Sequence, residues 1–510
     1  MHTVCISFHL EIIGILFFIV VNICIQSGQN KQQIKSKENP GSFNGLASII
    51  NYWYNALVGV QGAKLSIMSF STSVMVAAID LGTVLSGYAF SFRYEFEKDP
   101  LKIMTSNWIG GSPSLPYIKT PSVVLLKPNK TFHAFGCEAE NKYASLVEDN
   151  EHEGWLYFKR FKMTLHQNKS LKRTTTIKDV NGEEMPAMTI FTMAIKYFKD
   201  HLMGTLKSRV VNITEDVILW VLTVPAIWDD GAKQFMREAA AEAGILREQL
   251  LLVSEPEAAI FYYSHFPMET NFFEPGTKYM VLDLGGTCDT TVVEVQSNQS
   301  LRELHHVTDF ALAGTKVDDA FYQFLAKLFG NDVLSTLKDE NMDDYIAIFR
   351  EFELKKLTFK PESETKVTII LPFRLLEIFE EQTEETLIEV LQQTRYAETV
   401  QFIGDRLRIR PEIFKEFFSH TLQGIIQHIT EIMQSFQGES VSKILLVGDF
   451  SNSPMVLNAI KESFPNKTVT TPADPGLVVL KGAVLFGQTP RTVSCRFIRT
   501  STAVSSGIGM

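Results

Sequence analysis

The sequence predicts an α/β fold made of two related lobes. One plan occurs twice, in residues 76–92 and 279–295: an apolar strand, an aspartate, a glycine-containing turn and a second strand. Between these hairpins, apolar strands alternate with helical patterns, as in α/β domains. The hydrophobic content of 45% over 510 residues is enough for a large core. We therefore expect two α/β lobes whose glycine turns face one another.

Composition argues against two classes of function. The net charge of -10 disfavours sequence-independent nucleic-acid binding, which requires clustered Lys and Arg to neutralise phosphates. The five cysteines are scattered and odd in number, and no pair has the spacing of a zinc site. We expect a protein of a reduced, cytoplasmic compartment, with neither structural zinc nor nucleic-acid partners.

Residues 1–73 differ from the rest and are expected to form an N-terminal extension. Within it, residues 12–25 are almost continuously apolar and are preceded by Glu11 rather than by a basic residue. This length suits the core of a signal peptide better than a membrane span of about 20 residues, yet the basic flank of a signal peptide is missing. Membrane anchoring, secretion and removal from the mature protein stay open, and we expect membrane contact only if this segment is used.

The first lobe is predicted to span residues 74–270 and to begin with the hairpin Val74–Tyr94. Two short strands and a helix are expected at Ser122–Leu126, Thr131–Gly136 and Met185–His201. Between them, Trp155–Leu165 carries three basic residues among aromatic ones, and Lys162 is one of them. Taken alone, this pattern indicates an amphipathic segment with a solvated basic face.

The end of the first lobe alternates strands with helices. Val217–Val224 has the composition of a buried strand, and Asp229 or Asp230 can cap the helix that follows it. Gly244 is placed to end that helix. A second strand and helix are expected at Leu250–Val253 and Glu257–Tyr263.

The second lobe is predicted to span residues 271–487, leaving 488–510 as a C-terminal tail too short for another domain. After its central hairpin, we expect helices and strands at Val317–Phe329, Asp343–Leu357, Val367–Pro372, Leu376–Gln393, Glu412–Phe436, Lys443–Val447 and Leu477–Phe486, with a further helix from Pro454. Residues 376–393 are acidic and predict a single solvated helix.

The turn of the central hairpin has the chemistry of an anion site. Gly285 and Gly286 let successive backbone N–H groups approach an anion closely. Asp283 and Asp289 flank these glycines and can hold Mg²⁺ through water, because that ion keeps much of its hydration shell. The first hairpin repeats the Asp-x-Gly pattern, which favours two phosphate-binding turns around one nucleotide.

Several segments, taken in order, resemble the ATPase domain of the 70-kDa heat-shock protein family, most closely its divergent "12" branch. They are AIDLGTVLSGYAFSF (78–92), WLYFKRFKM (155–163), LTVPAIWDDGAKQFMREAAAEAGI (222–245), LLVSEPEAAIFYY (251–263), the central hairpin (279–295), LLVGDFSNSPMV (445–456) and KGAVLFG (481–487). The resemblance extends from about Val74 to the C-terminus and leaves the first 73 residues out.

The resemblance implies an actin-like ATPase fold, with ATP or ADP and Mg²⁺ in the cleft between the lobes. Lys162 would be the basic group near the γ-phosphate, and Glu255, Asp283 and Asp289 would complete the catalytic network. Asp80, Asp283 and Asp289 would hold Mg²⁺ through water. The residues implied for binding the nucleotide are Asp80, Gly82, Thr83, Gly285, Gly286, Thr287, Gly314, Thr315, Glu353, Lys356 and Gly448.

Parts of this assignment have simpler explanations. The three aspartates fit ordinary turn and cap chemistry, although the ordered motifs favour the functional role. For Glu353 and Lys356, a solvated i,i+3 ion pair explains the spacing equally well.

The sequence also departs from the family pattern. Val84 replaces a threonine in the first turn, and the loss of its hydroxyl costs about 1 kcal/mol or more of hydrogen bonding. The second turn has two glycines where three are usual, and Asp449 and Leu357 replace a glycine and an arginine beside the adenosine. Misplacing one electrostatic group costs about 3 kcal/mol in a transition state, so hydrolysis is affected more than binding.

These features imply an ATP-binding, chaperone-like protein with weak or no hydrolysis, acting in the stress response as a nucleotide-dependent module for an unidentified protein partner. The residues after Gly487 are too few for a peptide-binding domain, so the coupling of two sites that allostery requires is not expected. A nucleotide-free pseudo-ATPase scaffold is one alternative. A small-molecule kinase on the same fold is another, although we find no separate catalytic base for it.

Overall fold

The structure is a computed structural model that describes residues 73–108, 118–167, 172–209, 213–265, 274–297, 301–309, 312–435 and 441–489. Every described element belongs to one compact unit within residues 68–510. The apolar segment 12–25, the rest of the extension to residue 72, and tail residues 490–510 lie outside the described residues. Within the described ranges, no helix has both the length and the hydropathy needed to cross a bilayer.

A first large sheet is built around the strand that carries Asp80. Its strands run in the order β11 (Leu250–Ser254), β10 (Ile218–Val224), β1 (Met75–Leu81), β2 (Leu85–Phe92) and β3 (Met104–Thr105), with β4 (Thr120–Pro121) also paired to β2. The hairpin partner β2 is antiparallel to β1, whereas β10 is parallel to it and buried along its whole length. This continuous burial explains why β10 is apolar at every position except Thr223.

A second sheet repeats the same arrangement. Its order is β14 (Leu301–Asp309), β13 (Cys288–Val295), β12 (Lys278–Leu284), β18 (Lys443–Val447) and β19 (Thr468–Thr470). In both sheets, two antiparallel pairings on one side of the central strand are matched by two parallel pairings on the other. Asp80 and Asp283 are each the next-to-last residue of a central strand, opposite Gly87 and Asp289 respectively.

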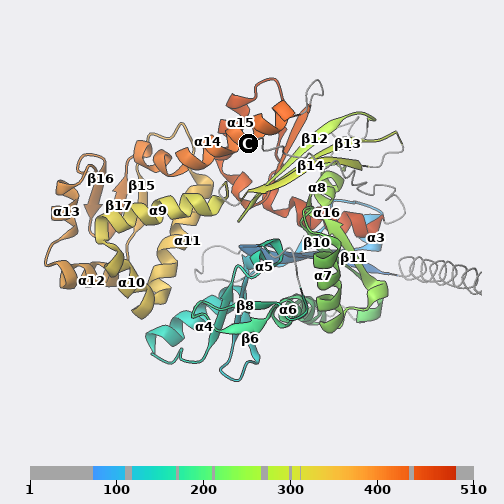
Figure 1. Cartoon of the computed structure of the whole chain (residues 1–510), viewed down its shortest axis with the longest axis horizontal. Coiled ribbons are helices and arrows are strands. Elements are labelled where there is room, and N and C mark those ends of the chain that lie inside the picture. The colour runs from blue at the N-terminus through green and yellow to red at the C-terminus, as the bar shows by residue number, and fades with distance from the viewer. Residues whose placement is uncertain are drawn as a thin grey trace, which may run out of the picture. The chain divides into compact units, whose positions relative to one another are not determined.

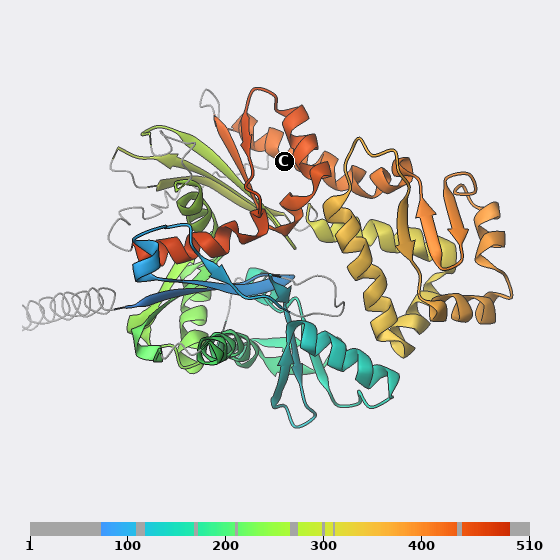
Figure 2. The ribbon, with the colours of Figure 1, turned by 180° about the vertical axis from the view of Figure 1, so that it is seen from behind.

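Two helices, α8 (Glu255–Tyr263) and α16 (Val478–Gln488), share one apolar core with both sheets. Val76 and Val221 come from the first sheet, and Tyr279 and Leu445 from the second. Figures 1 and 2 show α16, in red, between the two sheets. The halves of the described unit are therefore joined by packed side chains.

The other elements of the first half surround its sheet. They are α3 (Arg93–Phe96), β5 (Val123–Leu126), β6 (Phe132–Phe135), α4 (Gly136–Glu148), β7 (Leu156–Lys159), α5 (Met163–Gln167), β8 (Thr176–Lys178), β9 (Glu184–Pro186), α6 (Ala187–Ser208) and α7 (Asp230–Glu242). Buried residues of α6 and α7 share a core with the first sheet. The strands β5, β6 and β7 form a separate small sheet, and α4 packs against it.

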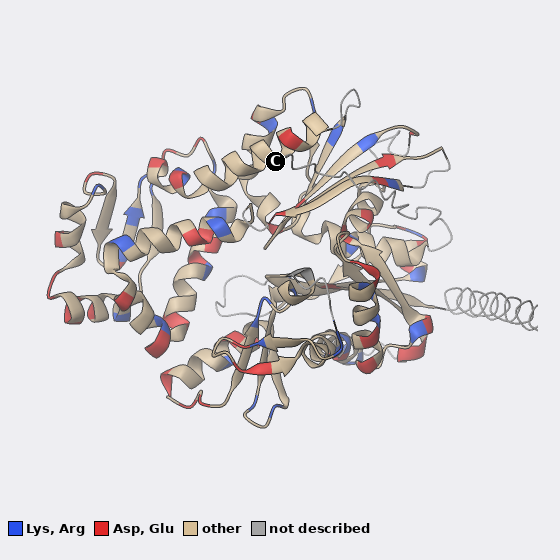
Figure 3. Cartoon of the chain, in the orientation of Figure 1, with Lys and Arg blue, Asp and Glu red and all other residues tan. Residues whose placement is uncertain are grey.

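The other elements of the second half are mostly helical. They are α9 (Gly314–Phe329), α10 (Asn331–Glu340), α11 (Met342–Thr358), β15 (Val367–Ile370), α12 (Phe373–Thr383), α13 (Leu387–Gln393), β16 (Val400–Ile403), β17 (Arg406–Ile409), α14 (Pro411–Ser435) and α15 (Pro454–Ser463). Their aromatic residues form a core in which the rings of Phe321 and Phe352 stack at 4.0 Å. Acidic and basic residues are intermixed along the helices of both halves (Figure 3).

The structure confirms the α/β class, both hairpins and the capping of α7. The Asp229 side chain accepts a hydrogen bond of 2.8 Å from the backbone N–H of Ala232, and Gly244 has the positive φ of a helix end. The single helix predicted over 376–393 is wrong. Glu384 has a φ of 58°, which ends α12, and Thr386 starts α13 with a capping box.

Candidate functional site

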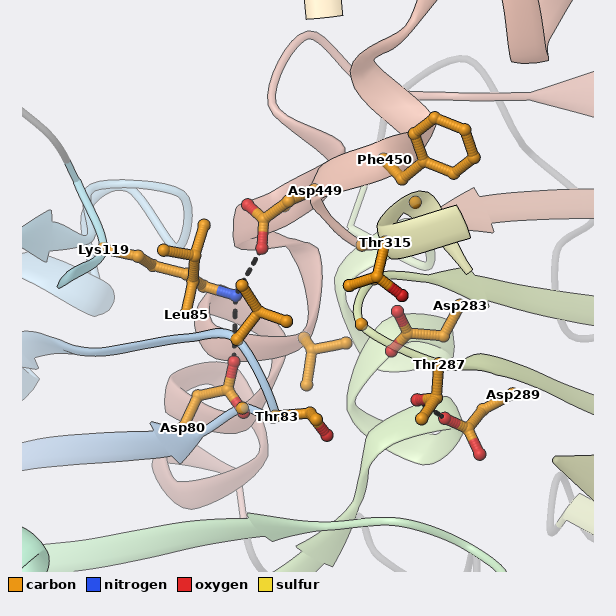
Figure 4. Close-up of a pocket in the computed structure, with 18 of the residues that line it drawn as sticks. Asp80, Thr83, Leu85, Lys119, Asp283, Thr287, Asp289, Thr315, Asp449 and Phe450 are labelled. Carbon is orange, nitrogen blue, oxygen red and sulfur yellow. Dashed lines mark hydrogen bonds and ion pairs between the residues drawn. The ribbon is translucent and has the colours of Figure 1, made fainter. Parts of the chain in front are cut away.

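A pocket lies between the two sheets and takes residues from both. It encloses about 820 Å³ of space, part of which is open to solvent. Every residue that the sequence predicted for the site lines this pocket: Asp80, Gly82, Thr83, Lys162, Glu255, Asp283, Gly285, Gly286, Thr287, Asp289, Gly314, Thr315, Glu353, Lys356 and Gly448. Figure 4 shows the two turns on opposite sides of this space. Segments far apart in sequence thus meet in one site.

Asp80 is held by two donors at the end of β1. Its Oδ1 accepts a hydrogen bond of 2.7 Å from the Thr223 hydroxyl, and its Oδ2 lies 3.0 Å from Lys119 Nζ. Burial by itself would raise the pKa of Asp80, but Lys119 and Lys162 outweigh this effect and lower it. The carboxylate is therefore ionised, and both of its oxygens are engaged.

Lys119 was not predicted as a site residue. Its side chain is only 9% exposed, and its ammonium lies between Asp80 and Asp449, with the Asp449 oxygen at 3.6 Å (Figure 4). Burial by itself would lower the pKa of Lys119, but Asp449 and Asp80 raise it above its ordinary value. A permanent positive charge is thus fixed in the wall of the pocket.

Hydrogen bonds from two threonines hold the Asp289 carboxylate beside the second turn. Asp289 accepts a hydrogen bond of 2.6 Å from the Thr287 hydroxyl and another from the hydroxyl of Thr308. Among the described residues, no side chain or backbone group donates a hydrogen bond to the neighbouring Asp283 carboxylate. Burial, together with the charges of Glu255 and Asp289, raises the pKa of Asp283 well above its usual range.

The two turns approach each other closely. A Cβ atom built on Gly286 would lie 2.5 Å from Val84 Cγ2 and 3.2 Å from the Thr83 Cβ. Only glycine fits at position 286 without displacing the first turn. At Gly285, in contrast, a Cβ would meet nothing within 4 Å, so this position borders the open space of the pocket.

Lys162 and Glu255 form a buried ion pair at the start of α8. Their charged atoms are 2.8 Å apart, and the Lys162 ammonium also lies over the Trp228 ring. Lys162 is 4% exposed, so the solvated basic face expected for its segment is wrong for this residue. Its segment is instead the strand β7, a turn with Arg160 at φ 54°, and the helix α5.

The opposite end of the pocket is organised by Lys356. Its Nζ lies 2.7 Å from Asp318 and 2.5 Å from Glu353, and it donates to the Gly314 carbonyl at 3.3 Å. The i,i+3 ion pair forms, and only its Glu353 side is solvated, because Lys356 is 2% exposed whereas the Glu353 side chain is 44% exposed. The Phe450 ring lies below this ammonium and within 3.2 Å of a Cβ built on Gly314.

Among the side chains that line the pocket, sequence reasoning missed the polar or aromatic Lys119, Asp318 and Phe450, and also the apolar Leu85, Pro225 and Val479. Asp318 had a usable signal, because it lies four residues after Gly314 and therefore on the same face of α9. Lys119 had none, since its position depends on the pairing of β4 with β2. Leu357 does not line the pocket.

More acidic than basic side chains line the pocket. Seven carboxylates and three lysines line it, and each lysine is already paired with a carboxylate. Of the three aspartates expected to hold Mg²⁺, only Asp283 keeps both oxygens free of hydrogen-bond donors. The described residues contain no group of three or more His, Cys, Asp or Glu placed to hold a metal ion.

Comparisons with known proteins agree with the geometry. The family model described as Hsp70 protein matches residues 157–492. Heat shock 70 kDa protein 12B of Homo sapiens is 34% identical in an alignment 486 positions long, which covers 83% of this chain and 70% of that protein. Heat shock 70 kDa protein 12A of Mus musculus is 32% identical, with 83% and 71% covered. The chaperone protein DnaK of Endomicrobium trichonymphae is 24% identical, with 60% and 44% covered.

Proposed function

The chain belongs to the Hsp70 family, in its heat shock 70 kDa protein 12 branch, and on that basis we propose that it binds ATP and ADP but hydrolyses ATP weakly or not at all. This family has the actin-like ATPase fold, and its nucleotide-binding domain is the part matched here. Nucleotide occupancy would then control contact with a protein partner, as expected of a chaperone-like module of the stress response in the cytoplasm.

The observation that carries the proposal is the open space at Gly285, in a pocket that two buried lysines also line. A phosphate chain needs N–H donors and positive charge in a space that no side chain fills. Gly285 supplies the space, because a Cβ there would meet no atom within 4 Å. Lys119 and Lys162 line the same pocket and supply the positive charge.

Weak hydrolysis follows from the arrangement of charges. Lys162 is paired with Glu255, and Asp449 adds a carboxylate that lines the phosphate pocket. Asp283 is the one aspartate of the expected trio with oxygens free for a water-bound Mg²⁺, which would neutralise phosphate charge if it bound there. Positioning and electrostatic stabilisation are the main sources of phosphoryl-transfer catalysis, so this balance favours binding over turnover.

Calorimetric titration of ADP and ATP into the full-length chain, in buffer with MgCl₂, tests the proposal. The diagnostic variant is Gly285→Val, because a Cβ at this position would meet no atom within 4 Å and the added side chain would occupy the space beside the turn. We expect the wild type to bind both nucleotides and this variant to lose binding while keeping its melting temperature. Gly204→Val is the matched control, because a Cβ at this helical position also meets no neighbour within 4 Å.

Thermal shift provides an independent measurement. A nucleotide at about 100 times its Kd stabilises the folded chain by about 2.7 kcal/mol, which is a shift of several degrees. A folded wild-type chain that shows neither heat of binding nor a thermal shift contradicts the proposal. That result would leave the nucleotide-free scaffold, which is favoured by the ion pair that each of the three lysines forms with a carboxylate.

A further inference from the structure

Lys119 places a positive charge beside Asp80, at a position that the sequence motifs did not predict. Its Nζ is 3.0 Å from Asp80 in the first sheet and 3.6 Å from Asp449, which follows strand β18 of the second sheet. The ammonium therefore lies at the carboxylate expected to orient a metal ion, and Figure 4 shows it directed into the space between the turns.

The position of Lys119 is set by the surrounding backbone. Its Cγ lies 3.2 Å from where Gly87 would carry a Cβ, so the aliphatic stem packs directly on β2. Ser122, three residues further along the chain, is hydrogen-bonded to the first turn. The Ser122 hydroxyl donates to the Gly82 carbonyl at 2.8 Å, and the Ser122 N–H donates to the Val84 carbonyl at 2.7 Å. This is a rigid, built site rather than a surface lysine.

The internal repeat shows what Lys119 changes. In the second sheet, the residue opposite Asp283 is Asp289, a second carboxylate. In the first sheet, the residue opposite Asp80 is Gly87, and the Lys119 stem occupies the space above it. One turn thus places two carboxylates side by side, whereas the other pairs its carboxylate with a cation.

The ammonium still has capacity for a ligand. It carries three N–H donors, and only Asp80 and Asp449 lie within ion-pairing distance of it among the described residues. Lys119 lines the pocket, so its ammonium borders the space in which phosphates would lie. A hydrogen bond between two charged groups is about twice as strong as a neutral one.

We propose that the Lys119 ammonium is a built-in counter-cation for the nucleotide's phosphates, so that this cleft binds ADP and ATP without a divalent cation. The inference rests on the proposed function, because it concerns the same pocket. It goes further by naming the group that neutralises the phosphates and by making Mg²⁺ dispensable for binding.

Titration of ADP and ATP into the full-length chain, in MgCl₂ and in EDTA, tests the inference. We expect the two wild-type affinities to agree within about threefold, since the positive charge belongs to the protein. Lys119→Met should weaken binding in EDTA by about tenfold or more, and MgCl₂ should restore part of the loss. Lys119→Arg should keep the metal-independent binding, and the exposed Lys196→Met is the matched control.

Each outcome is decisive. Wild-type binding in MgCl₂ that disappears in EDTA overturns the inference and leaves the proposed function intact. No binding under either condition refutes the proposed function, and the inference with it. If Lys119→Met binds in EDTA like the wild type, the counter-cation is not Lys119. Should that variant fail to fold, the wild-type comparison and Asp449→Asn, which should bind more tightly in EDTA, still decide the question.

Discussion

Glu255 and Lys162 show how a single buried charge pair can set the conditions for binding. Burial raises the pKa of Glu255 to about 7, an effect that Lys162 opposes and that the charges of Asp80 and Asp289 reinforce. Near neutral pH, Glu255 therefore changes between a neutral acid and an anion. Only the neutral acid leaves Lys162 free to attract another anion.

We predict that affinity for ADP decreases as the pH rises through about 7. Above that pH, Glu255 is ionised, competes for Lys162 and repels the phosphates, so binding should weaken several-fold between about pH 6 and pH 8. Calorimetric titration across this range measures the effect. Glu255→Gln should bind almost independently of pH, and an unchanged slope in that variant would exclude Glu255 as its origin.

The raised pKa of Glu255 also makes the stability of the folded chain depend on pH. The folded-state pKa of Glu255 lies above its ordinary value of 4.5, so the folded chain binds this proton more tightly than the unfolded chain does. Its contribution to stability is therefore largest at low pH and is lost as the pH rises from about 4.5 to 7.

At the scale of elements, the closest approach in the site is between the two hairpin turns. Val84, the residue that removes a hydroxyl from the first turn, also fills the space in front of Gly286. The valine therefore forms a contact between β1–β2 and β12–β13 in place of a hydrogen bond to a ligand. The two turns therefore approach each other most closely where Val84 lies against Gly286.

Gly286→Ala should separate these turns and weaken ADP binding by about tenfold or more, since overpacking typically costs about 1–3 kcal/mol. Val84→Ala removes the atom that a Cβ at residue 286 would strike. The double variant should therefore regain most of the affinity, as a double-mutant cycle in calorimetry would show. Additive losses in the double variant would mean that the turns do not meet.

The elements that sequence patterns predicted are the ones whose signals are local. Each hairpin joins two strands that are neighbours in sequence, and the Asp229 side chain caps a backbone N–H only three residues away. The helix break at Glu384 escaped prediction because nothing in its side chain demands a positive φ. Lys119 escaped because its position is set by the pairing of β4 with β2 and by the stem's contact with Gly87.

At the scale of the whole described unit, the halves are linked by an ion pair as well as by the shared core. Arg350 of α11 lies 2.6 Å from Glu140 of α4, and it also donates to Asn141. The pair is partly exposed, so it contributes about 1 kcal/mol or less to stability. Because this ion pair joins the two halves, we expect it to affect the rate at which the cleft opens more than the free energy of unfolding.

Arg350→Glu should speed ADP release several-fold while changing the melting temperature little, because like charges would then face each other between α4 and α11. Stopped-flow displacement of a fluorescent ADP analogue measures this rate. The charge-swapped double variant, Glu140→Arg with Arg350→Glu, should restore slow release. A double variant as fast as the single one would show that this pair does not hold the cleft closed.

The packing of α16 also bears on how the protein is made. Val76 of β1 lies against Gly487, where a Cβ would approach it to 2.5 Å, although the two residues come from opposite ends of the described unit. During translation, the ribosome therefore releases the first sheet long before the helix that covers it. The face of that sheet that α16 covers therefore stays exposed in the nascent chain until α16 emerges, and we expect the chain to be most prone to aggregation during that interval.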